Sequence, residues 1–423
     1  MHKTLRRFIV AMVYACGVVW LIGCGAPTGV ARLDSPEVGH PAVRVLLPVS
    51  DTVFTIQGSG RFITLGTISS GGNVVYYCSR PVQLRLADHR WVLTEKKRAV
   101  LETDLVQVTI YPKNSDDHLS INGKPYPGSF SFFPPKDSSG SPQVVNRVHI
   151  DDYLLGVLPA ELGQRSPNEF EAVKAQAVAA RTYALSRLEQ YGNVEYDLRA
   201  DVQDQMYTGL EHVPEWVKKA VRQTKGEVLR FGGNLIDAYY HSTCGGSTDD
   251  IAQVWGRPPQ PYLVAADDDT FCRWSKYYNW TETWDSATLK KNLATFLVSD
   301  STAPFSSFDR IIALRTEGKT AGGRVRRLVV TTDRGTWEIP ADRIRWALGR
   351  PSTGGPVLES ARFEIRPEFD GSGNLIRLTA QGGGYGHGVG ICQCGMIGRA
   401  RAGQTYRQIL THYYPGVTIE KTY

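Results

Sequence analysis

Glu161 is the side chain whose type and position point most clearly to chemistry. It follows the nearly uncharged run 153–160 (YLLGVLPA) and comes just before a segment expected to be a helix. A carboxyl group in apolar surroundings is partly desolvated, which raises its pKa toward the range where it can both donate and accept a proton. Such a group could cleave a sugar or acyl bond. The alternative is an ordinary surface glutamate in a loop before a helix.

Two later segments are also rich in groups that could contact a ligand. They are residues 241–248 (HSTCGGST) and 382–395 (GGGYGHGVGICQCG). Glycines on either side of Tyr385 and His387 would let the backbone approach a ligand closely and present both rings. The run matches neither the dinucleotide fingerprint nor the phosphate loop, because the glycine spacing is wrong and no Lys-Ser/Thr pair follows. The alternative is a tight glycine corner with a structural histidine.

The strongest helix signal follows Glu161. Residues 166–169 (SPNE) form a capping box with proline at the first helical position, and an alanine-rich helix is expected over 170–191. Lys174 and Arg181 fall within its apolar face, whereas Gln176 and Tyr183 fall opposite. Because an unpaired buried charge is costly, the two cations should face a wet groove or pair with carboxylates such as Glu161. They could otherwise extend past the edge of the helix into solvent.

Cysteine and histidine spacing suggests a possible metal site. His241 and Cys244 have short ligand spacing, and Cys272 could complete a structural zinc site, with Cys392 or Cys394 as further ligands. A Cys244–Cys272 disulfide and free thiols are the alternatives, since disulfides are permitted outside the cytoplasm. A nucleophilic pair of Cys244 or Cys392 with His387 would instead give an acyl-transfer enzyme.

The N-terminus has the form of a targeting signal. Lys3, Arg6 and Arg7 precede an apolar segment over 8–22, which ends in LIGC, a sequence that resembles a bacterial lipoprotein box. We therefore expect a signal peptide over 1–23, a lipid on Cys24 and a tether over 24–42. The mature protein would be held at a membrane on the extracytoplasmic side of the cell envelope. An ordinary secretory signal or an uncleaved anchor would be the alternatives.

Composition is that of a globular protein and argues against a nucleic-acid partner. The 423 residues are 42% hydrophobic and 21% charged, and a net charge of +6 is dispersed rather than gathered in a basic stripe. Strand-like runs alternate over 43–111 and 310–339, residues 112–143 are expected to be a loop, and 406–413 is expected to be helical. Because strands and helices mix without regular βαβ alternation, we expect an α+β fold over 43–423, with a β-rich second lobe around 286–380.

Four segments together resemble one known family. Residues 152–161 (DYLLGVLPAE), 171–184 (EAVKAQAVAARTYA), 241–246 (HSTCGG) and 386–393 (GHGVGICQ) are similar, in the same order, to segments of the stage II sporulation protein D and amidase-enhancer family. The resemblance covers roughly residues 43–421.

The resemblance implies a lytic transglycosylase that cleaves bonds between N-acetylmuramic acid and N-acetylglucosamine in peptidoglycan strands stripped of stem peptides. It assigns the essential acid to Glu161 and implies a cell-wall amidase as partner, in spore formation or cell division, and zinc in some relatives. It also implies that seven residues line or support the groove: Lys174, Gln176, Arg181, Tyr183, Ser242, Tyr385 and His387. One carboxyl that changes roles suffices for a lytic transglycosylase, whereas a hydrolase normally needs two. The other hypotheses are a non-catalytic glycan-binding enhancer of an amidase and a zinc-dependent hydrolase.

Overall fold

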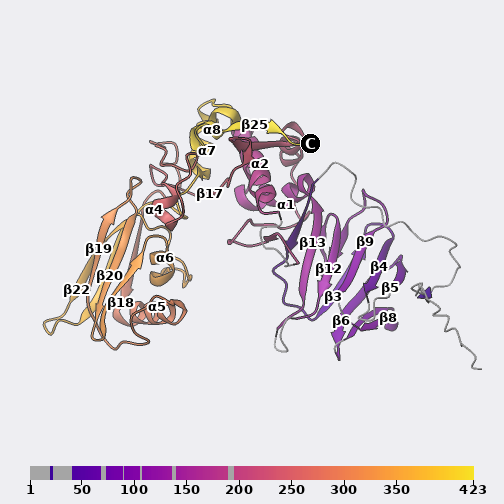
Figure 1. Ribbon diagram of the computed structural model, residues 1–423, viewed down its shortest axis with the longest axis horizontal. Coiled ribbons are helices and arrows are strands. Elements are labelled where there is room, and N and C mark those ends of the chain that lie inside the picture. The colour runs from indigo at the N-terminus through magenta and orange to yellow at the C-terminus, as the bar shows by residue number, and fades with distance from the viewer. Residues whose placement is uncertain are drawn as a thin grey trace, which may run out of the picture.

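The computed structural model describes residues 20–21, 41–67, 73–88, 90–104, 107–135, 140–188 and 195–423. Cys24 and the expected lipoprotein box lie outside these residues. Helix accounts for 23% of the structure and strand for 36%, which confirms the predicted α+β class. Within the described residues, no helix combines the length and apolar character needed to cross a membrane. Figure 1 shows two β-rich lobes on opposite sides of a helical middle part.

The N-terminal lobe consists of two sheets. Its strands are β1 (Trp20–Leu21), β2 (Ala42–Leu46), β3 (Val53–Gly58), β4 (Phe62–Thr67), β5 (Asn73–Cys78), β6 (Val82–Ala87), β7 (Arg90–Glu95), β8 (Arg98–Asp104), β9 (Gln107–Pro112), β10 (Leu119–Ile121), β11 (Lys124–Tyr126), β12 (Ser129–Phe133), β13 (Gln143–His149) and β14 (Leu198–Arg199). One sheet has the order β1-β5-β4-β9-β12-β13-β2-β14 and the other β11-β10-β3-β6-β7-β8. Aromatic side chains from both sheets meet in the core, where Phe132 lies 5.2 Å from Phe54 and 6.0 Å from Trp91 between ring centroids.

Strands β10, β11 and β12 occupy the segment that the sequence predicted to be a loop, so that prediction was wrong. The polar and glycine residues form the turns between short strands instead. Asn122 and Gly123, both with positive φ (50° and 84°), join β10 to β11 in the manner of a tight hairpin. The side chains of Leu119 and Ile121 alternate toward the core, which gives these short strands a buried face.

The middle part is mainly helical. It contains α1 (Ile150–Leu162), a 3₁₀ turn (Pro167–Glu169), α2 (Phe170–Ser186), α3 (Glu215–Gln223), α4 (Ile251–Trp255), α7 (Gln393–Arg401), α8 (Tyr406–Tyr413), the sheet of β15 (Glu227–Phe231), β16 (Asn234–Leu235) and β25 (Thr418–Lys421), and the pair β17 (Tyr240–His241) and β24 (Ile391–Cys392). Helix α2 packs against α1, α3, α7 and α8. Every residue of α2 from Ala172 to Leu185 except Lys174 is buried, so α2 is a core helix without the polar face that its periodicity predicted.

Helix α1 corrects a second expectation. The apolar run before Glu161 was expected to be an approach to a helix, yet it is itself helical and Glu161 lies in its last turn. Gly156 is needed there because a Cβ would meet the Gly209 carbonyl oxygen at 2.5 Å. The helix ends at Gly163, whose φ is +61° and whose N–H bonds to the Pro159 carbonyl.

The second lobe lies between these helices in the sequence. It comprises β18 (Trp280–Asp285), α5 (Ser286–Ser299), β19 (Ile311–Lys319), β20 (Val325–Thr332), β21 (Gly335–Pro340), α6 (Arg343–Leu348), β22 (Phe363–Phe369) and β23 (Leu375–Gly382), in sheets of order β18-β23-β22 and β19-β20-β21. Trp284, Leu293 and Trp337 belong to its separate core. A fully buried ion pair joins the lobe to the middle part, with Arg324 Nη1 2.8 Å from Asp249 Oδ2.

Candidate active site

Glu161 is held by donors from three other segments. The Met206 backbone N–H donates to Oε1 at 2.9 Å, the Tyr240 hydroxyl donates to Oε1 at 3.3 Å, and Gln393 Nε2 donates to Oε2 at 3.3 Å. Burial raises the pKa of Glu161, and these three hydrogen bonds offset part of the effect. All three donors are neutral. The carboxyl group is therefore easier to protonate than an exposed glutamate.

The two oxygens of Glu161 have different surroundings. Oε1 accepts two hydrogen bonds, whereas Oε2 accepts one, from the side-chain amide of Gln393. A proton on the carboxyl group is accommodated best by the oxygen with fewer donors directed at it. Oε2 is therefore the oxygen that can carry a proton and give it up.

A hydrogen-bond chain fixes the direction of the Tyr240 hydroxyl. Tyr153 donates to Gln205 Oε1 at 3.0 Å, and Gln205 Nε2 donates to the Tyr240 oxygen at 3.0 Å. Because this amide nitrogen can only donate, the hydroxyl of Tyr240 must direct its own proton elsewhere, and Glu161 Oε1 is within reach. The buried chain thus keeps Tyr240 as a donor to the carboxyl group.

The side chain of His387 holds the backbone carbonyl of Tyr240. Val389 N–H donates to His387 Nδ1 at 3.0 Å, so Nε2 carries the hydrogen and donates to the Tyr240 carbonyl at 2.9 Å. Burial lowers the pKa of His387 to about 4. The imidazole is therefore neutral at pH 7, and it holds the backbone of Tyr240 without adding charge.

The two glycine-containing segments are brought together by pairing of short strands. β17 and β24 run parallel with Tyr240 opposite Ile391, and Thr243 and Tyr385 exchange backbone hydrogen bonds of 2.7 and 3.0 Å. Gly386 has φ +110° and a Cβ there would lie 2.7 Å from His241 Cβ. Only glycine allows this approach, which explains why the run is glycine-rich.

The cations of α2 do pair with carboxylates, which was one of the outcomes expected from the sequence, but Glu161 is not one of the partners. Lys174 pairs with Glu171, and Arg181, which is fully buried, donates to Asp151 Oδ1 at 2.8 Å and to the Glu227 carbonyl at 3.1 Å. The partner of Lys174 lies one turn earlier in α2, and the partner of Arg181 lies in the first turn of α1. Arg181 therefore supports the helices that carry Glu161 and does not itself line a groove.

The other predicted groove residues occupy varied positions. Gln176 is fully buried within α2. The Tyr183 hydroxyl donates to Asp204 at 2.9 Å, Ser242 Oγ lies 3.3 Å from Thr243 Oγ1, and the Tyr385 ring lies 4.4 Å from that of Tyr277. Their roles toward a substrate stay predictions. The residues that directly touch Glu161, namely Tyr240, Gln393 and the Met206 amide, were not identified from the sequence, although Gln393 belongs to the recognised segment 386–393.

A buried cluster of three cysteines and one aspartate lies beside this site. The ligand atoms of Cys244, Asp268, Cys272 and Cys392 all lie within 4.8 Å of one another. The sulfurs of Cys244 and Cys272 are 3.5 Å apart, far longer than a disulfide bond of about 2.05 Å, and both are free thiols. His241 is not a member, contrary to the predicted set, because its Nδ1 faces the Val389 carbonyl at 3.3 Å.

The cluster fits a tetrahedral metal ion. Zinc binds thiolates at about 2.3 Å, which places two sulfurs about 3.8 Å apart in a tetrahedral site. The observed spacing is close to this, and backbone N–H groups of Gly246 and Gly395 already donate to the sulfurs of Cys244 and Cys392 at 3.3 and 3.2 Å. Tyr413 donates to Asp268 Oδ1 at 2.6 Å, which orients the carboxylate as outer partners of metal ligands commonly do.

These features define an α+β protein in which one partly buried carboxyl group, that of Glu161, is held by neutral hydrogen-bond donors. Comparison with known proteins then identifies the family. The chain belongs to the stage II sporulation protein D family, whose model (Stage II sporulation protein, SpoIID) matches residues 138–231. A second model, for a domain of unknown function (DUF8618), matches residues 268–390.

Three relatives are similar over most of this chain. An uncharacterized protein of Brachyspira hyodysenteriae is 32% identical over 306 residues, which is 72% of this chain and 75% of the relative. The amidase enhancer of Bacillus subtilis is 32% identical over 351 residues, 73% of this chain and 46% of the relative. The stage II sporulation protein D of Bacillus subtilis is 27% identical over 304 residues, 66% of this chain and 76% of the relative.

Proposed function

We propose that this protein is a lytic transglycosylase that cleaves the bond between N-acetylmuramic acid and N-acetylglucosamine in peptidoglycan strands, with Glu161 as acid and then base. The observation that carries the proposal is the environment of Glu161. Burial raises its pKa while neutral donors hold its orientation. Membership of the stage II sporulation protein D family supports a role in the cell wall.

In the first step, Glu161 Oε2 gives its proton to the glycosidic oxygen as the bond from that oxygen to C1 breaks. The leaving sugar departs with a hydroxyl group. The new carboxylate is stabilised by the hydrogen bonds from Met206, Tyr240 and Gln393, which are in place before the charge develops.

In the second step, the same carboxylate accepts the proton of the C6 hydroxyl of the muramic acid. The C6 oxygen attacks C1 and closes a 1,6-anhydro ring, and Glu161 returns to its protonated form. No water enters, so one carboxyl group performs both proton transfers. Tyr240 and Gln393 keep the carboxyl group in one orientation through both steps.

A second candidate function is favoured by one comparison. A relative is named amidase enhancer, so this chain could instead bind glycan and stimulate a cell-wall amidase without cleaving the strand. Incubation of the purified protein with peptide-free glycan strands, followed by mass spectrometry, separates the two. The transglycosylase produces 1,6-anhydro ends, a hydrolase produces reducing ends, and the enhancer leaves strands intact but accelerates an added amidase.

We further propose that the protein acts outside the cytoplasm, attached to a membrane by a lipid on Cys24 and associated with a cell-wall amidase. The basis is the LIGC sequence of residues 21–24 and the amidase-enhancer relative. Metabolic labelling with a fatty-acid analogue should mark the parent, and Cys24→Ala should abolish the label. A labelled Cys24→Ala protein would contradict the lipid assignment.

We propose that Cys244, Asp268, Cys272 and Cys392 hold a structural zinc ion. Zinc would tie together three segments: the chain after β17, the turn region 268–272, and the junction of β24 with α7. Metal analysis should find about one zinc per chain, and Cys272→Ser should lose the zinc and unfold at a lower temperature. The control is Cys394→Ser, at a half-buried cysteine outside the cluster, which should keep the metal. Equal zinc content in both variants would contradict the assignment.

A further inference from the structure

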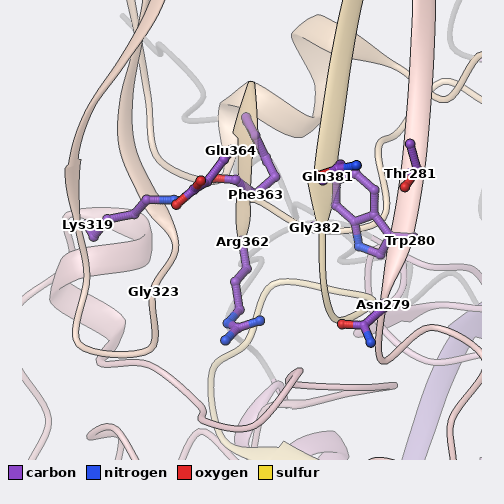
Figure 2. Close-up of a pocket in the computed structure, with 10 residues that line it drawn as sticks. All are labelled: Asn279, Trp280, Thr281, Lys319, Gly323, Arg362, Phe363, Glu364, Gln381 and Gly382. Atoms are coloured by element: carbon purple, nitrogen blue, oxygen red, sulfur yellow. The ribbon is translucent and has the colours of Figure 1, made fainter. Parts of the chain in front are cut away.

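A pocket of about 570 Å³ lies in the second lobe, apart from the contacts of Glu161. Its lining includes Asn279, Trp280, Lys319, Arg362, Glu364 and Gln381. Figure 2 shows Lys319 and Trp280 on opposite sides of the pocket, with Arg362 between them. The whole lining falls within residues 279–382, inside the segment that matches a domain of unknown function.

One wall of the pocket is a fixed aromatic ring. Trp280 packs so closely over Gly382 that a Cβ at this glycine would lie 2.3 Å from the indole ring. Its Nε1 donates to the Gly384 carbonyl at 3.0 Å, and the side chain remains partly exposed. An immobile, partly exposed ring beside amide and carboxylate side chains is a surface on which the apolar face of a sugar ring can lie.

The pocket also has more positive than negative groups. Arg362 uses Nε to donate to the Gly322 carbonyl at 3.2 Å, and Lys319 donates to the Phe363 carbonyl. Within the described part of the chain neither cation lies in an ion pair, and Glu364 is the one carboxylate in the lining. The terminal nitrogens of Arg362 remain available for a carboxylate, for which a guanidinium group is well shaped.

A short stretch of backbone connects the pocket with the candidate active site. Gly382 lines the pocket, and three residues later Tyr385 exchanges backbone hydrogen bonds with Thr243, next to the strand that carries Tyr240. The segment that ends at the pocket therefore continues directly into the backbone that positions the candidate active site.

We infer that this pocket is a second binding site for the glycan strand, in which Arg362 and Lys319 hold the free lactyl carboxylate of a muramic acid residue and Trp280 supports a sugar ring. The inference rests on the proposed glycan substrate. In an intact strand the stem peptide is joined to this carboxylate as an amide, so the negative charge is exposed only after the peptide has been removed. The pocket thus distinguishes the two kinds of strand by the group at the lactyl position, which is a carboxylate in one and an amide in the other.

Binding measurements on the full chain with Glu161→Gln, which prevents cleavage, test the inference. Two ligands are compared, namely peptide-free glycan fragments and chitin oligomers, which lack the lactyl carboxylate. Arg362→Gln and Lys319→Met should each weaken binding of the glycan fragments about tenfold, as expected for loss of a charge-assisted contact, and leave chitin binding unchanged. The matched control is Lys290→Met, an exposed lysine of α5 in the same lobe, which should bind both ligands as the parent does.

Gln381→Ala is a second variant that should keep the fold. Because Gln381 is exposed, its loss should not lower the unfolding temperature, yet it should weaken the binding of both ligands. If the Arg362 and Lys319 variants bind glycan as tightly as the parent, or lose both ligands equally, carboxylate recognition in this pocket is wrong. Failure of the proposed function can be distinguished from failure of the pocket assignment. If the parent releases no anhydro ends and yet these variants lose glycan binding, the pocket assignment stands and catalysis does not.

Discussion

Replacing Tyr240 by phenylalanine should change the pH dependence of catalysis in a direction that the structure fixes. The hydroxyl donates to Glu161 Oε1 and stabilises the carboxylate form, so the hydrogen bond lowers the pKa of Glu161. Without it, the protonated acid persists to higher pH. The alkaline limb of the rate profile should therefore move upward in Tyr240→Phe.

The size of the shift follows from the geometry. Hydrogen bonds to charged groups contribute about 1.5–3 kcal/mol, but the 3.3 Å contact is longer than the usual O–H···O distance, so about 1 kcal/mol is reasonable. Since about 1.4 kcal/mol corresponds to one pH unit, the limb should move by about 0.7 unit. Gln205 keeps its other bond to the Ala180 carbonyl at 3.3 Å, so the fold should tolerate the change.

The assay is kcat/KM against pH on peptide-free glycan strands, which reports the ionisation of the free enzyme. Tyr153→Phe is the matched control, because its hydroxyl belongs to the same chain but contacts Gln205 and not Glu161. It should give a smaller shift in the same direction. A limb that moves to lower pH in Tyr240→Phe, or equal shifts in both variants, would refute the reasoning.

Two further predictions concern stability. Arg324→Met should lower the free energy of unfolding by about 3–5 kcal/mol, because it leaves the buried Asp249 carboxylate without its ion-pair partner. The control Arg334→Met, at an exposed arginine, should change the free energy of unfolding by less than about 0.5 kcal/mol. Urea unfolding measures both variants, and equal effects would contradict the role of the ion pair. Because burial lowers the folded pKa of His387 to about 4, its contribution to stability is present above the unfolded pKa of about 6.5 and is lost as pH falls toward 4. His387→Gln should therefore reduce the loss of stability between pH 7 and pH 5 by up to about 2 kcal/mol, and an unchanged pH dependence would show that the imidazole is not buried as described.

Local signals in the sequence predicted several elements well. Helix α8 has the expected bounds, Tyr406–Tyr413, because Thr405 and Gln408 form a capping box and Pro415 and Gly416 follow its end. Helix α1 was missed because Gly156 and Pro159 disfavour a helix in isolation. Tertiary packing overrides that preference, since the glycine lets the chain near Gly209 pack directly on the helix.

The candidate site was predictable only in part. Glu161 stands out because a carboxylate ends an apolar run, and His387 because glycines flank it. Tyr240 and Gln393 are brought to Glu161 by parallel pairing of two-residue strands about 150 positions apart, for which the sequence gives no local signal. Asp268 was not predicted as a member of the cysteine cluster for the same reason. Its place there depends on a tertiary contact and not on its spacing from the cysteines in the sequence.

The most direct test of the account is the rate at which Glu161→Gln releases 1,6-anhydro ends from peptide-free glycan strands. The variant should fold normally, because Gln can accept from the Met206 N–H and the Gln393 amide can rotate to present its oxygen. At neutral pH it should be at least as stable as the parent, since it removes a carboxyl group whose charged form burial disfavours. Release of anhydro ends should fall to background, while the exposed Glu215→Gln control remains as active as the parent. A folded Glu161→Gln protein that cleaves at the parental rate would contradict the central claim.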